Sequence, residues 1–242
     1  MSEAGALLFA RYAYPPNELG YCGPAGASAL LAPGVPGEIA ARARQFEGAW
    51  SYLELLAATA GIGDPLDETV VRAYWVGGAL LDEVPPAALV AWLGDRFRGQ
   101  RGGTWRSAGE RAVAHHSFHV FEVYPWAAML GAGPSPVALR VLDRCRVRTG
   151  VVLRVDGERA IVRSGPLVSD GTSLSRGPDR PEEVRWSAGG RSLIGAPAPG
   201  DRVALHWDWV CDVLTAEQAG RLDALQERQL GQFRLNAARL HT

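Results

Sequence analysis

The second half of the chain contains the segment Cys145-Arg146-Val147-Arg148-Thr149-Gly150-Val151-Val152-Leu153-Arg154-Val155-Asp156-Gly157. β-Branched residues are frequent from 147 to 155, and Asp-Gly is a common turn between antiparallel strands. The segment therefore predicts a strand followed by a tight turn, with residues 159–164 as the partner strand. Further short strands are expected at 183–186, 191–194 and 202–209, and such spacing is typical of a small barrel.

The sequence before this segment has a helical pattern. Between residues 38 and 60, apolar side chains recur mostly at steps of three and four, as on one face of an amphipathic helix. Further helices are expected at 67–81, from Pro85 onward, and at 112–130 with a bend near Pro125. Residues 1–36 are expected to be irregular and rich in turns, because proline and glycine concentrate at 14–24.

A last helix is expected after the strands. Thr215-Ala216-Glu217-Gln218 matches a capping box, and the apolar face that follows comprises Leu222, Leu225, Leu230, Phe233 and Leu240. Residues 131–136 are rich in glycine and proline and form a candidate linker. We therefore predict an α+β protein of two domains: residues 1–135, mainly α-helical, and residues 143–242, a small β-barrel with a C-terminal helix.

Composition limits the partners and the compartment. The 242 residues are 47% hydrophobic and carry a net charge of −1, so the chain has ample core and no field that attracts nucleic acid or anionic membrane. No apolar run approaches the length of a membrane span, and no basic segment suggests a signal peptide. Three cysteines are too few for a disulfide framework, which predicts a reduced cytoplasmic protein.

Three motifs in the second half occur in a recognisable order. They are Cys145 followed by Gly150 and a valine-rich strand, then Gly200-Asp201-Arg202-Val203-Ala204-Leu205-His206, then Leu214-Thr215-Ala216-Glu217-Gln218-Ala219. Over about residues 143–232 this arrangement resembles the HypC/HupF family of [NiFe]-hydrogenase maturation chaperones. That family has a cysteine before a Pro-Gly pair, a Gly-Asp-x-Val strand ending in histidine, and a closing helix.

The resemblance implies an OB-like β-barrel that carries the Fe(CN)₂CO unit transiently. It implies a HypD-like scaffold and the hydrogenase large-subunit precursor as partners, with Cys145 and His206 as the functional pair in an accessory protein rather than an enzyme. Thiolate is a soft ligand suited to such iron, and imidazole completes the site. Two departures are that Cys145 is internal, whereas the family cysteine is N-terminal, and that Thr149 replaces the family proline. The alternative is an inert buried cysteine and a core histidine.

Three of the five histidines lie in one short stretch, His115-His116-Ser117-Phe118-His119. On a helix, His115, His119 and Glu122 fall within about 60° of one another, and such a face holds a divalent metal. On a strand the set disperses, and histidines that line a core are the alternative. The pattern lacks the glutamate directly after the first histidine that zinc proteases use.

The proline-rich start gathers four further polar groups, Tyr14, Asn17, Glu18 and Cys22, in a stretch expected to be a functional loop. Cys22 is a candidate nucleophile with a histidine of the 115–119 stretch as its base, and a buried structural cysteine is the alternative. The N-terminal half resembles an uncharacterised actinobacterial family in which this loop and the histidine stretch recur.

Three functions follow from these patterns. The first is an accessory factor for [NiFe]-hydrogenase maturation, built on Cys145 and His206. The second is a protein-binding module of the same shape that carries no metal. The third is an enzyme that uses Cys22 or a metal held by His115, His119 and Glu122.

Overall fold

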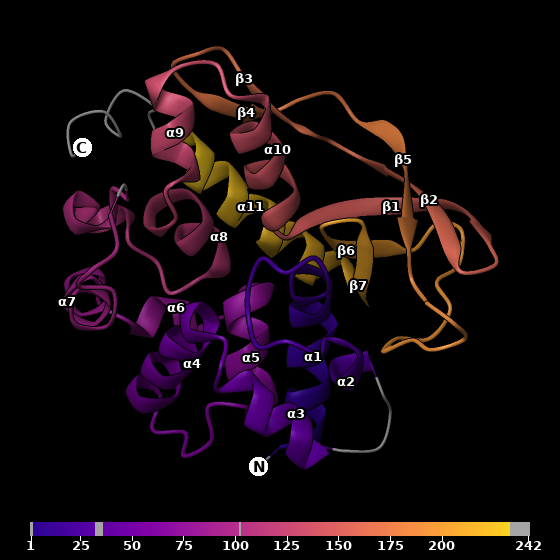
Figure 1. The fold of residues 1–242 in the computed structure, drawn as a ribbon, viewed down its shortest axis with the longest axis horizontal. Coiled ribbons are helices and arrows are strands. Elements are labelled where there is room, and N and C mark those ends of the chain that lie inside the picture. Colours follow the sequence, from indigo (N-terminus) through magenta and orange to yellow (C-terminus); the bar gives the residue numbers. More distant parts are fainter. Residues whose placement is uncertain (1, 32–35, 102, 233–242) are drawn as a thin grey trace.

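The computed structural model describes residues 2–31, 36–101 and 103–232. The first part is helical (Figure 1), with two short 3₁₀ turns at Trp105–Ser107 and Gly109–Arg111 and a π-helical turn at His119–Val123. Its helices are α1 (Glu3–Glu18), α2 (Ser28–Leu31), α3 (Pro36–Ala43), α4 (Glu47–Thr59), α5 (Glu68–Trp75), α6 (Leu80–Glu83), α7 (Pro86–Arg96), α8 (His116–Phe118), α9 (Trp126–Ala132) and α10 (Pro136–Cys145). The predicted α+β class is confirmed.

Strands and one helix make up the second part. They are β1 (Arg148–Asp156), β2 (Arg159–Ser164), β3 (Leu167–Ser169), β4 (Leu174–Arg176), β5 (Arg180–Arg185), β6 (Arg202–His206), β7 (Trp209–Val213) and α11 (Ala216–Gln232). Five of the strands pair in the order β1-β2-β5-β7-β6, and β6 pairs back with β1, so the sheet closes on itself. The strand expected at 191–194 is absent, and the described chain has only an isolated Ala188–Arg191 bridge there.

The prediction of an irregular segment at 1–36 is wrong for residues 3–18, which form the helix α1, whereas residues 19–27 consist of turns as expected. Ser2 caps α1 by accepting a hydrogen bond from the Gly5 amide at 3.1 Å, and the helix continues through Pro15 and Pro16. Proline is costly inside a helix because it removes an amide donor. Burial of α1 outweighs that cost, since most of its 16 residues are buried and the apolar ones from Ala6 to Tyr14 pack in the main core.

The helix expected at 112–130 is also interrupted. Regular helix begins only at His116, passes into the π-helical turn, and ends before Pro125. Helix α9 then starts at Trp126, and Ser135 caps α10 by accepting from the Ala138 amide at 3.2 Å. Because the helix begins at His116 and changes to a π-helical turn at His119, the histidines of this stretch do not share one regular helical face.

One hydrophobic core joins the helical part and the closed sheet. Phe9 of α1 and Trp75 of α5 belong to the same buried cluster as Trp209 of β7 and Leu222 of α11. At this junction, Arg11 and Arg72 both form ion pairs with Asp212, at 2.8 and 3.3 Å. Side chains from the helical part and from the closed sheet therefore meet at the interface between them.

The closing helix has the predicted capping box, since the Gln218 amide donates to the Thr215 hydroxyl and Gln218 accepts from the Thr215 amide. Leu222 and Leu230 of α11 are buried as expected, whereas Phe233 and Leu240 lie outside the described residues. Among the helices that the structure describes, none combines the length and the apolar character needed to cross a membrane.

Candidate metal centre

Cys145 is the last residue of α10, and the arginines around it fix its position. Arg144 and Arg148 both bind the carboxylate of Glu182 on β5, with Arg148 at 2.9 Å. Arg146 donates to the Gly165 carbonyl at 2.7 Å and pairs with Asp143 at 3.0 Å. The turn from α10 into β1 is thus attached to the sheet on both sides of the cysteine.

His206 is the last residue of β6, as the motif predicted. Trp207 follows it with φ of +56°, the only positive φ at a non-glycine residue in the described chain and an unusual conformation for a bulky side chain. The Trp207 amide donates to the Arg144 carbonyl at 2.7 Å, and Arg148 donates to the Trp207 carbonyl at 3.0 Å. Because residues 144 and 207 are joined in this way, Cys145 and His206 lie beside each other.

A hydrogen bond to α1 sets the protonation of the His206 ring. Nδ1 lies 2.7 Å from the Tyr12 carbonyl, which only accepts, so Nδ1 carries the proton and Nε2 has a free lone pair. The side chain is fully buried, and Nε2 has no hydrogen-bond partner among the described residues. Such an oriented, unprotonated nitrogen is what a metal ligand requires.

The sequence explains why the Tyr12 carbonyl is available. In a regular α-helix this carbonyl would accept from the amide of the fourth residue on, which is Pro16. Proline has no amide hydrogen, so the carbonyl has no partner within α1 and accepts from His206 instead. The proline pair that predicted a loop therefore serves to orient a histidine.

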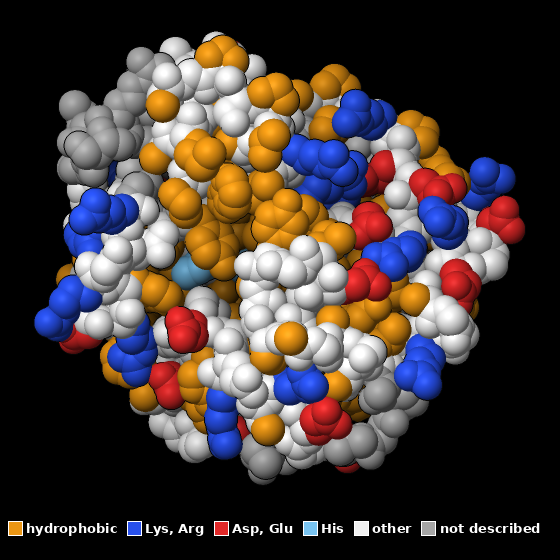
Figure 2. All heavy atoms as spheres, viewed as in Figure 1, with side chains coloured by type: hydrophobic (Ala, Val, Ile, Leu, Met, Phe, Trp, Pro, Cys, Tyr) orange, Lys and Arg blue, Asp and Glu red, His pale blue; other side chains and the backbone are white. Residues whose placement is uncertain are grey.

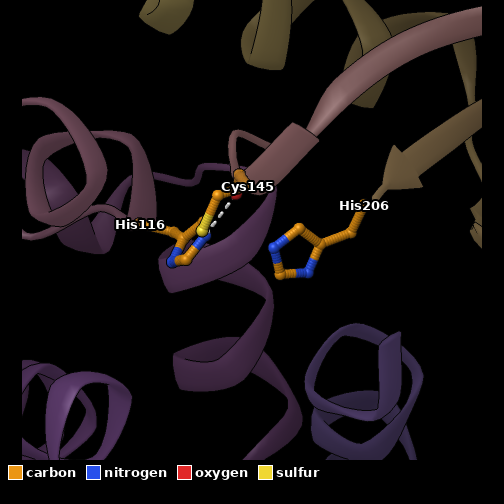
Figure 3. Close-up of side chains that lie close together, drawn as sticks. All are labelled: His116, Cys145 and His206. Atoms are coloured by element: carbon orange, nitrogen blue, oxygen red, sulfur yellow. Dashed lines mark hydrogen bonds between the residues drawn. The ribbon is translucent and has the colours of Figure 1, made fainter. Parts of the chain in front are cut away.

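His116, the first residue of α8, completes the group. Its Nε2 lies 2.8 Å from the Cys145 carbonyl, so that nitrogen donates, and its Nδ1 accepts from the Tyr74 hydroxyl at 3.2 Å. The rings of His116 and His206 are 5.1 Å apart between centroids. In Figure 3 the Cys145 sulfur is drawn over the His116 ring, and the His206 ring stands apart with one nitrogen facing them.

His116, Cys145 and His206 form a candidate metal-binding triad. One ligand atom from each lies within 4.8 Å of the others, and all three residues are buried. Burial lowers the pKa of His116 to about 4 and that of His206 well below its usual value, so both rings are neutral. Burial raises the pKa of the Cys145 thiol, so a bound cation must displace its proton. One sulfur and two imidazoles suit zinc, iron or cobalt.

The triad borders a cavity of about 420 Å³ at the junction of the two parts of the chain. Aromatic side chains form much of its wall, among them Phe46, Tyr74, Trp75 and Tyr124. Tyr21 also lines it and is 48% exposed, so the cavity reaches the surface. Figure 2 shows a hollow in this face bordered by hydrophobic side chains, with histidine visible within it.

The structure does not unite His115, His119 and Glu122. His115 has extended backbone angles and caps α8, with Nδ1 bonded to the Ser117 hydroxyl at 2.8 Å, so it does not lie on a helical face with His119. His119 bonds the Tyr52 hydroxyl at 3.2 Å, and Glu122 accepts from Thr104 and from Arg111. The π-helical turn also changes the spacing after His119. The candidate metal-binding cluster found among the described residues contains His116 instead.

The polar residues of the proline-rich start have separate roles. Tyr14 donates to Glu18 at 2.7 Å, and Glu18 pairs with Arg185. Asn17 donates to the Cys22 carbonyl at 2.8 Å and so holds the turn after α1. Tyr14, Asn17 and Glu18 belong to α1 rather than to a loop, and of the four predicted residues Cys22 lines the cavity.

The Cys22 thiol differs from an activated nucleophile. Burial raises its pKa to about 12, whereas a catalytic cysteine needs a lowered value. Its position on the cavity wall beside Cys145, His116 and His206 is the more informative property.

The fold and site define an α+β protein with a candidate metal centre built from both parts of the chain. Residues 1–240 match the sequence model of a family described as Family of unknown function (DUF6390), and the chain belongs to that family. No match was found among the curated proteins or the solved structures. The matched range includes His116, Cys145 and His206.

Proposed function

We propose that this protein is an accessory factor for [NiFe]-hydrogenase maturation that holds an iron fragment at Cys145, His206 and His116. The observation that carries the proposal is the meeting of Cys145 and His206, which are 61 positions apart, at one cavity with a third candidate ligand, His116. These two residues are also the pair that the HypC/HupF resemblance implies. The closed sheet with α11 then corresponds to the OB-like barrel of that family.

The residues have distinct roles in this proposal. The Cys145 thiolate is the soft donor for iron that carries strong-field ligands, and it forms as the thiol loses its proton. His206 offers Nε2, which is already unprotonated, unpartnered and oriented by Tyr12. His116 offers Nδ1 in exchange for its hydrogen bond with Tyr74. The iron unit is cargo, received from a HypD-like scaffold and passed to the large-subunit precursor.

Infrared spectroscopy tests the proposal. The protein is purified without oxygen from a host that expresses its hydrogenase maturation genes, and the cyanide and carbonyl stretching region is recorded. We expect bands in the wild type that are lost in Cys145→Ala. Cys211→Ala is the matched control, because Cys211 is equally buried but does not line the cavity, and it should retain the bands.

The outcomes separate the candidate functions. Absence of bands while a large subunit copurifies would overturn cargo binding and favour a protein-binding module. Absence of both bands and partner would overturn the maturation function altogether. Bands that persist in Cys145→Ala would place the cargo at another site.

A further inference from the structure

We propose that Cys22 supplies a second thiolate, so that the bound metal has two sulfur and two nitrogen ligands from Cys22, Cys145, His116 and His206. This inference rests on the metal site of the proposed function, adds a ligand from the turn after α1, and concerns a divalent cation without ligands of its own. The three diatomic ligands of an Fe(CN)₂CO unit would leave only three positions on six-coordinate iron, which the triad fills. In the structure Cys22 lies outside the 4.8 Å cluster of the other three, so the thiol moves inward as the metal binds. The thiol lines the same cavity as all three.

Contacts around Cys22 bring its turn to the other ligands. The Tyr21 ring packs on Trp207 with 4.2 Å between centroids, and Trp207 directly follows His206. Trp207 is in turn hydrogen-bonded to Arg144, which directly precedes Cys145. The neighbours of Cys22, His206 and Cys145 are thus in contact, and this places the three segments around one point of the cavity wall.

Hydrogen bonds fix the backbone of the turn that carries Cys22, whereas they do not fix the thiol. Asn17 donates to the carbonyls of Cys22 and Pro24 at 2.8 and 2.7 Å, which fixes the backbone on either side of Gly23. Cys22 itself is only partly buried, whereas Cys145 and Cys211 are buried. Cys22 packs against the edge of the main core, and we expect a rotation of its side chain to bring the thiol toward the other ligands.

Charge favours two thiolates over one. A divalent cation with one thiolate and two neutral imidazoles leaves a net charge of +1 within a cavity of largely aromatic walls, where an uncompensated charge is costly. A second thiolate makes the site neutral. Glu47 also lines the cavity, but its side chain is exposed and it is not part of the clustered ligands. Each thiol releases one proton to solvent as its metal–sulfur bond forms, and no electron is transferred.

The unpartnered Nε2 of His206 points to a ligand in this cavity, and Nε2 of His119, which lines the same cavity, is also without a partner among the described residues. The His206 nitrogen is fully buried, its proton-bearing partner Nδ1 is already committed to Tyr12, and no described residue donates to it. Native proteins rarely leave such an atom unsatisfied. A metal ion bound there satisfies it, and the two cysteines on the cavity wall supply the negative charge that the ion requires.

Cobalt(II) titration of the reduced full-length protein tests the inference, because sulfur-to-cobalt charge transfer scales with the number of thiolates. We expect the charge-transfer absorbance per bound cobalt to fall about twofold in Cys22→Ser and in Cys145→Ser. Cys211→Ser is the matched control and should equal the wild type. Circular dichroism verifies the fold of each variant, and X-ray absorption of the cobalt-loaded wild type counts the sulfurs directly.

The possible failures are distinct. A wild type that binds no cobalt overturns the metal site of the proposed function. A wild type that binds cobalt with one sulfur, and a Cys22→Ser spectrum equal to it, overturns the role of Cys22 and leaves the triad in place. Two sulfurs in the wild type and one in Cys22→Ser support the fourth ligand.

Discussion

His115 and His116 are neighbours in the sequence but belong to different parts of the structure. His115 bonds within its own turn, to the Ser117 side chain and amide. His116 bonds the carbonyl of Cys145, 29 positions away, and its ring packs against His206. One histidine completes a helix cap and the other joins α8 to the sheet.

The Glu122 carboxylate and the His206 ring differ in how fully their polar atoms are used. Within the His115–Glu122 stretch, Nε2 of His115 and Nε2 of His119 are also buried without a partner among the described residues. Glu122 accepts from the Thr104 hydroxyl and the Arg111 guanidinium, so its carboxylate is engaged within the protein. In the His116–Cys145–His206 cluster, Nε2 of His206 is without a partner in the described chain, and the neighbouring space is a cavity. A saturated group stabilises the fold, whereas an oriented and unsaturated one is available to a ligand.

The largest expected effect tests this difference with one substitution at two adjacent positions. We expect His116→Gln to weaken cobalt(II) binding by more than about 100-fold, since losing even an outer hydrogen-bond partner of a ligand costs about 10–100-fold. His115→Gln should leave the affinity within about threefold of the wild type, because its ring only caps α8. Competition with a chelator measures both constants. Equal losses in the two variants would abolish the distinction between the regions.

The second prediction concerns stability. Glu122→Gln removes the charge from a carboxylate that is 1% exposed and bonded to Thr104 and Arg111. Hydrogen bonds to charged groups contribute about 1.5–3 kcal/mol, so we expect the free energy of unfolding to fall by about 2 kcal/mol. Urea denaturation measures this value, while cobalt affinity should not change. A large loss of cobalt affinity in Glu122→Gln would indicate that Glu122 is a metal ligand after all.

The sequence indicated some of this site and not the rest, for identifiable reasons. Cys145 and His206 were found because motif order over a long stretch carries information about pairing in space. A strand starting at residue 202 was also predictable, but the pattern extended it to 209, whereas β6 ends at His206 and a turn at Trp207-Asp208 leads into β7. The α+β class followed from the change of periodicity near residue 147.

His116 was missed because the helix begins at residue 116, four residues later than the periodicity indicated. With the helix extended to residue 112, His115 and His119 shared a face and His116 pointed elsewhere. The capping geometry at His115 and the π-helical turn at 119 depend on tertiary packing, which local pattern does not encode. The spacing of two adjacent histidines alone gave no signal that the second was the ligand.

The helix α1 was missed because two adjacent prolines are ordinarily a sign of a turn. Pro16 nevertheless lies inside α1, and it leaves the Tyr12 carbonyl free for His206. A proline inside a helix, which breaks the usual rule, was therefore a signal of the site. The histidine that binds the freed Tyr12 carbonyl lies 194 positions further on and could not be identified without the structure.

The third prediction tests this role of proline. We expect Pro16→Ala to weaken cobalt binding by about tenfold, because the new amide competes for the Tyr12 carbonyl and loosens a ligand held by an outer partner. The stability of the apoprotein should not fall, since the helix gains an amide donor. Pro15→Ala is the matched control, because it affects the Arg11 carbonyl instead. Identical affinities for Pro15→Ala and Pro16→Ala would overturn the argument.

The smallest expected effect concerns the support of Cys145, in contrast with that of His115. Glu182 binds both Arg144 and Arg148, which lie on either side of the cysteine segment. Burial raises the pKa of Glu182, but the Arg148 cation, the Ser164 hydroxyl and the Arg144 cation outweigh it, and the net pKa is lowered. A carboxyl with a lowered folded-state pKa stabilises the fold above its unfolded pKa, and this stabilisation is lost as the pH falls through the folded pKa.

We therefore expect the free energy of unfolding to fall between pH 7 and about pH 3 by about 1 kcal/mol more in the wild type than in Glu182→Gln, the usual scale for an ion pair that keeps some contact with water. Urea titrations at the two pH values measure the difference. At neutral pH the variant should also bind cobalt somewhat less tightly, because the arginines no longer share an anchor on β5 and the turn that carries Cys145 is less fixed. If acid destabilises both proteins equally, the Arg144–Glu182–Arg148 network does not hold the cysteine, and the backbone bond from Trp207 to Arg144 alone accounts for its position.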